Sequence, residues 1–243
     1  MSIVTRSTVV VLAAVALLAP AATLLAADED VTWLIQYDGS VLPGPDWKAA
    51  GTVQATIEEG ALRLVDDSAE FGHYRAAWKS GSNQEIVVEA KVKVGQATGS
   101  QKKKPATSLW PWRDGAPVSV LVSDGRHQEG LVLFPSQAAS FTDRFIPMDT
   151  TNRFHTYRLV IHGRDMSISV DGVPHVQGQG AFWKPAESPQ PFIQFGSNAK
   201  VATGDAHWAS IKLGVRKATG PARPDPLQVT IGQAWDIPRD DAR

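Results

Sequence analysis

The 243-residue sequence contains no cysteine. Disulfide cross-links, thiolate nucleophiles, cysteine-ligated zinc sites and iron–sulfur clusters are therefore excluded. Without such links, we expect the packing of apolar side chains to stabilise the folded chain.

A strong excess of charge of one sign is lacking as well. The 24 Lys and Arg residues stand against 25 Asp and Glu residues, which gives a net charge of −1. Proteins that bind nucleic acid or anionic membranes normally carry a basic excess. The sequence therefore predicts neither partner.

Long apolar segments are restricted to one run, Val9–Ala19, near the N-terminus. Arg6 precedes this run, and the segment that follows it ends in the small residues Ala26 and Ala27. A cationic, then apolar, then small-residue order is typical of a secretory signal peptide. The run is also shorter than the roughly 20 residues that cross a bilayer. We therefore predict a signal peptide at residues 1–27, a secreted or periplasmic protein, and no membrane span after cleavage.

Helical periodicity is absent after this segment, and the dominant period is two. In residues 85–94, Ile86, Val88 and Ala90 fall on one face, whereas Glu85 and Glu89 fall on the other. This alternation predicts a strand with one buried and one wetted face.

Similar strands recur along the chain. Residues 157–161 and 166–170 alternate in the same way, and Asp171-Gly172 favours a tight hairpin turn before Val173. Further strands are predicted at residues 52–57, 61–65, 73–78, 118–122, 129–134, 191–195 and 207–215. Short strands separated by turns predict an all-β fold, a two-sheet antiparallel jelly-roll sandwich.

We assign this sandwich domain to residues 28–216. Residues 217–243 then form a Pro-rich link and a C-terminal tail that can hold one further strand at 227–231. The segment 95–117 is rich in Gly, Lys, Ser and Pro and is too long for a simple hairpin loop. We expect it to be either functional or mobile.

Six segments follow one another in a characteristic order: Asp46-Trp47, Gly60–Leu64, Ile86–Val92, Phe154–Leu159, Ser169–Gly172 and Phe195–Trp208. Taken in this order, they resemble the concanavalin A-like lectin/glucanase superfamily, in particular the laminin-G-like jelly-roll domains of exported bacterial proteins. The resemblance implies two antiparallel sheets, one of them concave, with carbohydrate bound on the concave face or at its rim loops.

The hydrolases of that superfamily carry a strand with the pattern Glu-x-Asp-x-x-Glu, which this sequence lacks. The nearest pair, Glu85 and Glu89, is separated by about 13 Å along a strand. Glycosidases need their carboxyl groups about 5.5 Å apart, or under about 10 Å for the inverting class. This pair cannot form such a dyad. Nucleophile-elbow, phosphate-binding and dinucleotide motifs are also absent.

Two clusters can nevertheless bind a ligand. In the first, Asp124 to Glu129, an Arg, a His and a Glu at a strand start could bind a carboxylated sugar, although Asp124-Gly125 also suits an ordinary turn. In the second, tryptophans of the irregular segment offer flat faces for sugar rings, or else cover the sandwich edge. The predicted ligand-binding residues are Trp110, Trp112, Arg113, Asp124, Arg126, His127 and Glu129.

A catalytic alternative uses a neighbouring set of polar residues. Arg153, His155 and Tyr157 fall on one face of a predicted strand, and with His127 and Glu129 they could supply the groups of a noncanonical hydrolase or lyase. Alternatively, His155 is buried and simply hydrogen-bonded.

Histidine motifs for zinc are absent, so a zinc site is not predicted. No cofactor is predicted from the residues themselves, but the resemblance makes calcium an option, because laminin-G-like relatives often hold one. Oxygen ligands could come from Asp66, Asp67, Asp143 or Asp149.

The sequence as a whole predicts a secreted carbohydrate-binding or adhesion-type lectin-like domain without catalysis, with a glycan as its partner. A glycan-cleaving hydrolase or lyase of the same fold, and a structural protein-interaction domain, remain the alternatives. Convergence of Arg126, Glu129, Arg153 and His155 in one concave groove would favour catalysis, whereas their scatter would favour a structural scaffold.

Overall fold

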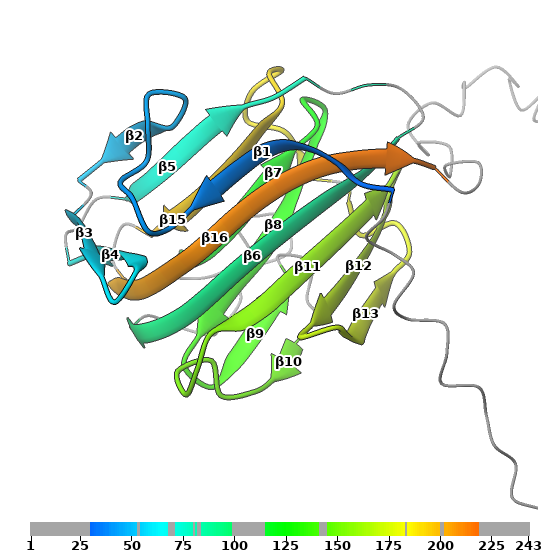
Figure 1. Cartoon of the computed structure of the whole chain (residues 1–243). Helices are drawn as coiled ribbons and strands as arrows, with labels where there is room; N and C mark the ends of the chain where they lie inside the picture. The colour runs from blue at the N-terminus through cyan, green and yellow to red at the C-terminus, as the bar shows by residue number, and fades with distance from the viewer. Residues whose placement is uncertain are drawn as a thin grey trace, which may run out of the picture.

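The computed structural model describes residues 30–52, 54–67, 71–79, 81, 84–98, 115–140, 145–182, 184–199 and 202–218. In these ranges the chain forms two antiparallel sheets of eight strands each, which confirms the predicted all-β jelly-roll sandwich (Figure 1). No helix in the described ranges is long and apolar enough to cross a membrane.

Sheet A faces the viewer in Figure 1. Its strand order is β13 (Val173–Gly178), β12 (Asp165–Val170), β11 (His155–His162), β6 (Gln84–Ala97), β16 (Gly204–Lys217), β4 (Ala61–Asp66) and β3 (Gln54–Glu58), and β1 (Thr32–Asp38) pairs with the second half of β16.

Sheet B lies behind sheet A. Its order is β10 (Phe145–Pro147), β9 (Gln137–Ser140), β8 (His127–Phe134), β7 (Ser119–Ser123), β15 (Phe192–Ser197), β5 (Gly72–Ala77) and β2 (Lys48–Gly51), and β14 (Lys184–Pro185) pairs with β8.

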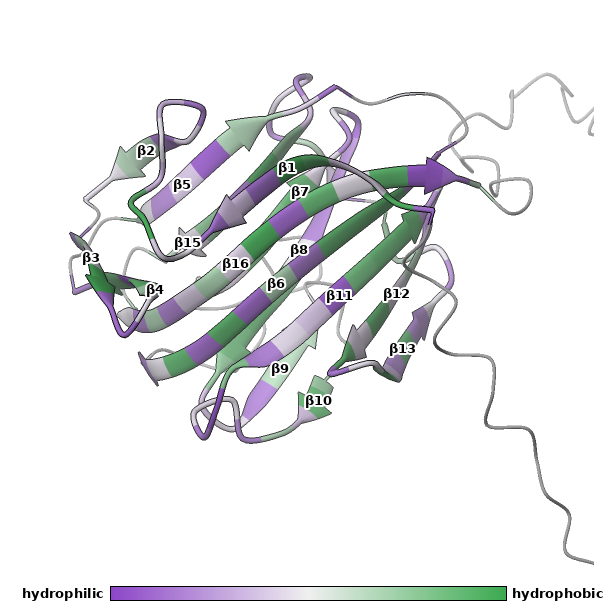
Figure 2. Cartoon of the chain, in the orientation of Figure 1, coloured by the Kyte–Doolittle hydropathy of each residue, from purple (hydrophilic) through white to green (hydrophobic). Residues whose placement is uncertain are grey.

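The period-two strands fold as predicted. Polar and apolar residues alternate along β6 and β16 (Figure 2), and Val88 and Ala90 of β6 are buried in the core. The three consecutive strands β11, β12 and β13 pair antiparallel. Asp171 and Gly172 both have positive φ angles, 50° and 80°, as the tight turn requires.

Five short strands were not predicted: β1, β2, β9, β10 and β14. Strand β2 reads Lys-Ala-Ala-Gly, which is poor in strand-forming residues, and β10 reads Phe-Ile-Pro, which is only three residues long and ends in Pro. Strand β1 did carry a signal, because Trp33, Ile35 and Tyr37 alternate with more exposed residues. In addition, β6 extends to Ala97, so the irregular segment begins later than predicted.

The inner faces of the two sheets form the main core. Phe195 of β15 lies at its centre, with ring centroids 5.0 to 5.8 Å from those of four neighbours: Tyr37, Trp47, Tyr74 and Trp208. Aromatic side chains thus connect β1, β5, β15 and β16 across the sandwich.

The outer faces, which point away from the partner sheet, differ between the sheets. On sheet A, Glu89 forms ion pairs with Arg158 and Lys212, and Glu85 pairs with Arg216. On sheet B the outer face holds a second buried cluster of apolar side chains: Ala116, Leu121, Val132, Phe134, Ala139 and Phe192. The central strands of sheet B are therefore buried on both faces.

Candidate functional site

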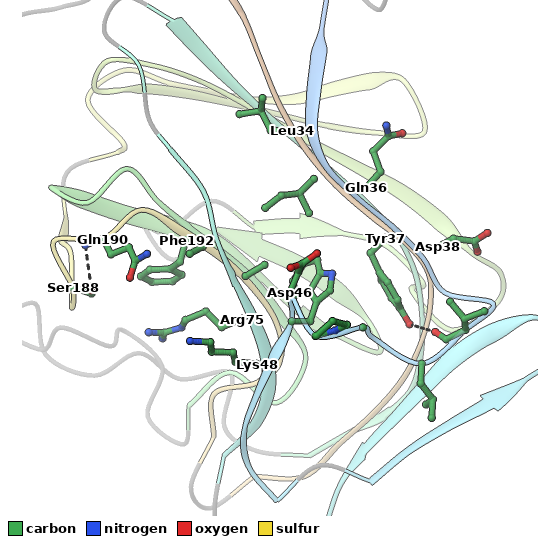
Figure 3. Close-up of a pocket in the computed structure, with 18 residues that line it drawn as sticks. Leu34, Gln36, Tyr37, Asp38, Asp46, Lys48, Arg75, Ser188, Gln190 and Phe192 are labelled. Atoms are coloured by element: carbon green, nitrogen blue, oxygen red, sulfur yellow. Dashed lines mark hydrogen bonds between the residues drawn. The ribbon is translucent and has the colours of Figure 1, made fainter.

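A groove of about 890 Å³ opens between β1 of sheet A and strands β2 and β5 of sheet B (Figure 3). Its wall includes the exposed aliphatic side chains Leu34, Val41 and Leu42. Buried rings of Tyr37 and Trp47 also line it. We call this hollow the edge groove. Exposed aliphatic groups above buried rings give it an apolar side.

Tyr37 fixes the loop that closes the groove. Its hydroxyl donates a hydrogen bond of 2.6 Å to the backbone oxygen of Val41, and its ring meets the edge of Trp47. Burial, with the neighbouring Tyr74 and Asp38, raises the pKa of Tyr37 above its usual value. The hydroxyl therefore remains protonated and keeps donating at physiological pH.

Two cations line the same groove from neighbouring strands. Lys48 of β2 is directly opposite Arg75 of β5 in the strand register, and the two side chains extend in parallel in Figure 3. Like charges in directly opposite positions destabilise a sheet. Within the described ranges Lys48 forms no ion pair, and Arg75 forms one long pair of 3.4 Å with Glu187. The groove therefore concentrates positive charge.

Arg75 is held in place by a chain of polar side chains. Its Nε donates to Oε1 of Gln194 at 2.7 Å, and its guanidinium carbon lies 4.0 Å from the centre of the Phe192 ring. Gln194 donates in turn to Asn198, which donates to Ser119 at 2.9 Å. Arg75 is thus oriented before any ligand arrives.

A second hollow, of about 840 Å³, lies at the end of the sandwich where the β7–β8 turn approaches the end of β5. We call it the end hollow. It is lined by Asp124 and Arg126, which the sequence predicted as ligand-binding residues, and by Lys79 and His162. Gln190 lines both hollows, so the two are adjacent.

Asp124 shapes the turn that carries Arg126. Its Oδ1 accepts hydrogen bonds from the backbone N–H groups of Arg126 at 2.7 Å and His127 at 2.6 Å. Gly125 has a φ of +89°, and a Cβ there would lie 2.4 Å from the Pro189 backbone oxygen. The carboxylate and the glycine together fix the backbone and leave the Arg126 side chain exposed at the hollow.

Glu129 lies elsewhere. It is 0% exposed, and it pairs across the sheet with Val122, whose side chain is in the main core with Leu131. Side chains two residues apart on a strand point the same way, so Glu129 points inward. His127 points to the same side and meets the edge of the Phe182 ring. Glu129 therefore lies in the core and not at the surface predicted for it.

The residues of the catalytic alternative are not brought together. The end hollow holds Arg126 together with His162, at the last position of β11. His155 is at the first position of the same strand, about 23 Å away, and so cannot act with Arg126. Tyr157 is 1% exposed and points into the core. Arg153 forms an ion pair with Asp171 near the first residue of β11, at the end of the strand away from the end hollow.

His155 is buried and hydrogen-bonded, as the alternative interpretation expected. Its Nδ1 lies 2.8 Å from Oδ2 of Asp171, and its Nε2 lies 2.9 Å from Oδ1 of Asn152 and 3.0 Å from the Asp149 backbone oxygen. Burial opposes ionisation of Asp171, but hydrogen bonds from the Thr156 backbone and from His155 lower its pKa overall. This network holds the β12–β13 turn against the start of β11.

Replacing His155 with alanine should lower the free energy of unfolding by about 2 kcal/mol, because several polar partners lose their hydrogen bonds. Urea denaturation of the variant would measure this. His175 is exposed on β13 and provides the control, since His175→Ala should change stability by less than about 0.5 kcal/mol. Equal effects in both variants would contradict the structural role of His155.

The tryptophan loop lies outside the described residues. This applies to Trp110, Trp112 and Arg113, and also to Asp143 among the predicted calcium ligands. In the described ranges, no group of three or more His, Asp or Glu side chains could hold a metal ion. Asp67 accepts a hydrogen bond from Gln54, and Asp149 accepts two from Thr151. Calcium binding stays a prediction.

Among solved structures, the chain is similar to a carbohydrate esterase from the Shiga toxin-encoding bacteriophage phi24B, with a TM-score of 0.53 and 14% identity. The match covers 76% of this chain and 99% of that one. The chain has the concanavalin A-like sandwich fold. The predicted resemblance is thereby confirmed for the fold, whereas the laminin-G-like subclass stays a prediction.

Other solved structures match with lower TM-scores. A sialidase matches with a TM-score of 0.49 and 12% identity over 76% of this chain, which spans only 18% of the sialidase. A β-glucanase from Bacillus licheniformis matches with a TM-score of 0.47 and 11% identity, over 76% of this chain and 98% of the enzyme. No protein-family model and no curated protein matches the sequence.

Proposed function

We propose that this chain is a carbohydrate-binding, lectin-like domain that acts outside the cytoplasm without catalysis. The edge groove is the observation that carries the proposal. The fold supports it too, since the phage protein with the same architecture is named as a carbohydrate esterase.

The composition of the groove suits a sugar. A sugar ring has apolar C–H faces and a rim of hydroxyls, so its sites combine apolar surface with a few oriented polar groups. In the edge groove, Leu34 and Leu42 offer the apolar surface. Asp46, Gln190 and Arg75 offer an acceptor, an amide and a fork of donors. Each can hydrogen-bond one or two hydroxyls.

Binding without bond cleavage is favoured by the positions of the acidic and basic groups. The predicted catalytic residues are divided between the core side of the sheets and the β12–β13 turn, and none of them lines either hollow. In the groove, Asp38 accepts a hydrogen bond from the Ser40 backbone and points away from Asp46 (Figure 3). The two carboxylates therefore do not face each other across a bound sugar.

Export is part of the proposal and rests on the predicted signal peptide, which lies outside the described residues. Mass spectrometry of the protein from the periplasm or culture medium tests it. A mature N-terminus near Asp28 is the expected result, and recovery of the chain only from the cytoplasm with residues 2–27 still attached would contradict export.

A binding screen tests the function. The purified protein should bind members of an oligosaccharide panel by isothermal titration calorimetry and should release no reducing ends from them. Gln190→Ala and Asp46→Ala should each weaken binding about tenfold, as expected for the loss of a charged or bidentate hydrogen bond. Gln177→Ala, at an exposed site on β13, is the matched control and should bind normally. Product release, or unchanged binding in both groove variants, would overturn the proposal.

A further inference from the structure

Four cationic side chains line the two adjacent hollows. Lys48 and Arg75 lie in the edge groove, and Lys79 and Arg126 lie in the end hollow, with Gln190 lining both. Lys79 and Arg126 are exposed and form no ion pair within the described ranges. The cations therefore follow one continuous surface that passes Gln190.

Most carboxylates of the same surface already accept hydrogen bonds from backbone N–H groups. Asp124 accepts two backbone N–H groups of its own turn, and Asp38 accepts the Ser40 N–H. Glu187 contacts Arg75 only at 3.4 Å in an exposed pair, and such a pair is weak. Asp46 is the remaining carboxylate of the linings. Positive charge thus dominates the groups that can reach a ligand.

The opposed pair of Lys48 and Arg75 adds to this argument. Two cations at directly opposite strand positions repel each other, and an anion placed between them removes the repulsion. Nε of Arg75 donates to Gln194 and Nη2 forms the long pair with Glu187, which leaves the Nη1 N–H groups available for an oxyanion. A carboxylate or a sulfate group satisfies both side chains.

We propose that the ligand is an acidic glycan that runs from the edge groove past Gln190 into the end hollow. Its carboxylate or sulfate groups contact Lys48 and Arg75 in the groove, and Arg126 and Lys79 in the hollow. Each hollow has the size of a site for a drug-sized ligand, about 300–1,000 Å³. The two together accommodate an oligosaccharide. This inference rests on the proposed carbohydrate binding and specifies the class of ligand that is bound.

Matched polysaccharides test the charge requirement. Polygalacturonate should bind at least tenfold more tightly than its fully methyl-esterified form, or dextran sulfate at least tenfold more tightly than dextran. The two pairs distinguish carboxylate from sulfate as the recognised group. The preference should fall as ionic strength rises from about 0.01 to 0.5 M, because exposed charges are then screened.

Single variants test the placement. Lys48→Gln and Arg126→Gln should each weaken binding of the acidic form three- to tenfold and thereby reduce its preference over the neutral form. Lys91→Gln, at an exposed site on β6 in sheet A, is the control and should not alter binding.

The possible outcomes distinguish the acidic-glycan inference from the proposed carbohydrate binding on which it rests. Equal binding of neutral and charged forms would overturn the acidic-glycan inference and leave carbohydrate binding intact. An equal loss in Lys91→Gln would mean that overall charge, and not this surface, attracts the ligand. Failure to bind any glycan, charged or neutral, would overturn the proposed function itself.

Discussion

Replacing Phe195 with alanine is expected to lower the free energy of unfolding by about 3–5 kcal/mol. The ring is 0% exposed and touches four other aromatic rings contributed by three further strands and the loop before β2. Its removal leaves a cavity where the two sheets meet, and the aromatic pairs lose about 0.5–1.5 kcal/mol each beyond the lost burial. Urea denaturation followed by tryptophan fluorescence measures the change.

Phe145→Ala is the matched control for this prediction. Phe145 is 45% exposed on the short strand β10, so its removal should cost less than about 1 kcal/mol. Phe195→Leu should fall between the two, because leucine fills part of the cavity. A similar cost at positions 145 and 195 would show that Phe195 does not organise the core.

The second large effect is a loss of stability in mild acid, caused by His73. This imidazole is 5% exposed and is stacked on Phe71. Burial, and then the positive charge of Arg75, lower its pKa from 6.5 to about 4. Its cross-strand neighbours, Ala50 and Gly196, bring no carboxylate to the ring. The folded state therefore holds His73 neutral.

The pH window follows from these two pKa values. Below about pH 6.5, His73 of the unfolded chain binds a proton, whereas His73 of the folded chain stays neutral until the pH nears 4. The stability that depends on neutral His73 is therefore fully present above pH 6.5 and is lost as the pH falls toward 4. Between pH 7.5 and pH 5 the loss is about 2 kcal/mol.

Denaturation curves at pH 5 and 7.5 for the native protein and for His73→Gln test this account. The variant should lose about 2 kcal/mol less than the native protein over the same interval. His175→Gln, at the exposed histidine, should keep the native pH dependence. Parallel curves for the native protein and His73→Gln would show that His73 is not the group responsible.

Strands with one wetted face were the predictable part of the fold. In β6 and β11, polar residues mark most positions of the outer face, with Val87 and Val160 as the exceptions, so the sequence indicates both the strand and its orientation. Strand β8 is different, because Leu131 belongs to the main core whereas Val132 belongs to the outer cluster of sheet B. A strand buried on both faces shows no alternation. The inward direction of Glu129 could not be predicted for that reason.

Only part of the candidate site could be predicted from the sequence, for a similar reason. Asp124 and Arg126 were found because an Asp-Gly turn is a local signal. Lys48 and Arg75 are far apart in sequence and become neighbours only through the register of β2 and β5. Strand β2 has no sequence pattern of its own, and Gln190 comes from a loop between β14 and β15. Contacts that depend on strand register or on loop positions cannot be predicted from the sequence, because they form only when the sheets assemble.

The position of β16 has a consequence for the order in which the chain can fold. This last described strand lies in the middle of sheet A, where it pairs with β6 on one side and with β4 and β1 on the other. Thr32 meets its partner Val215 only after nearly all of the described chain has been synthesised. Folds dominated by such distant pairings form in milliseconds to seconds, slowly for their size. A nascent chain that has not yet released β16 therefore cannot close sheet A, and it remains accessible to chaperones until then.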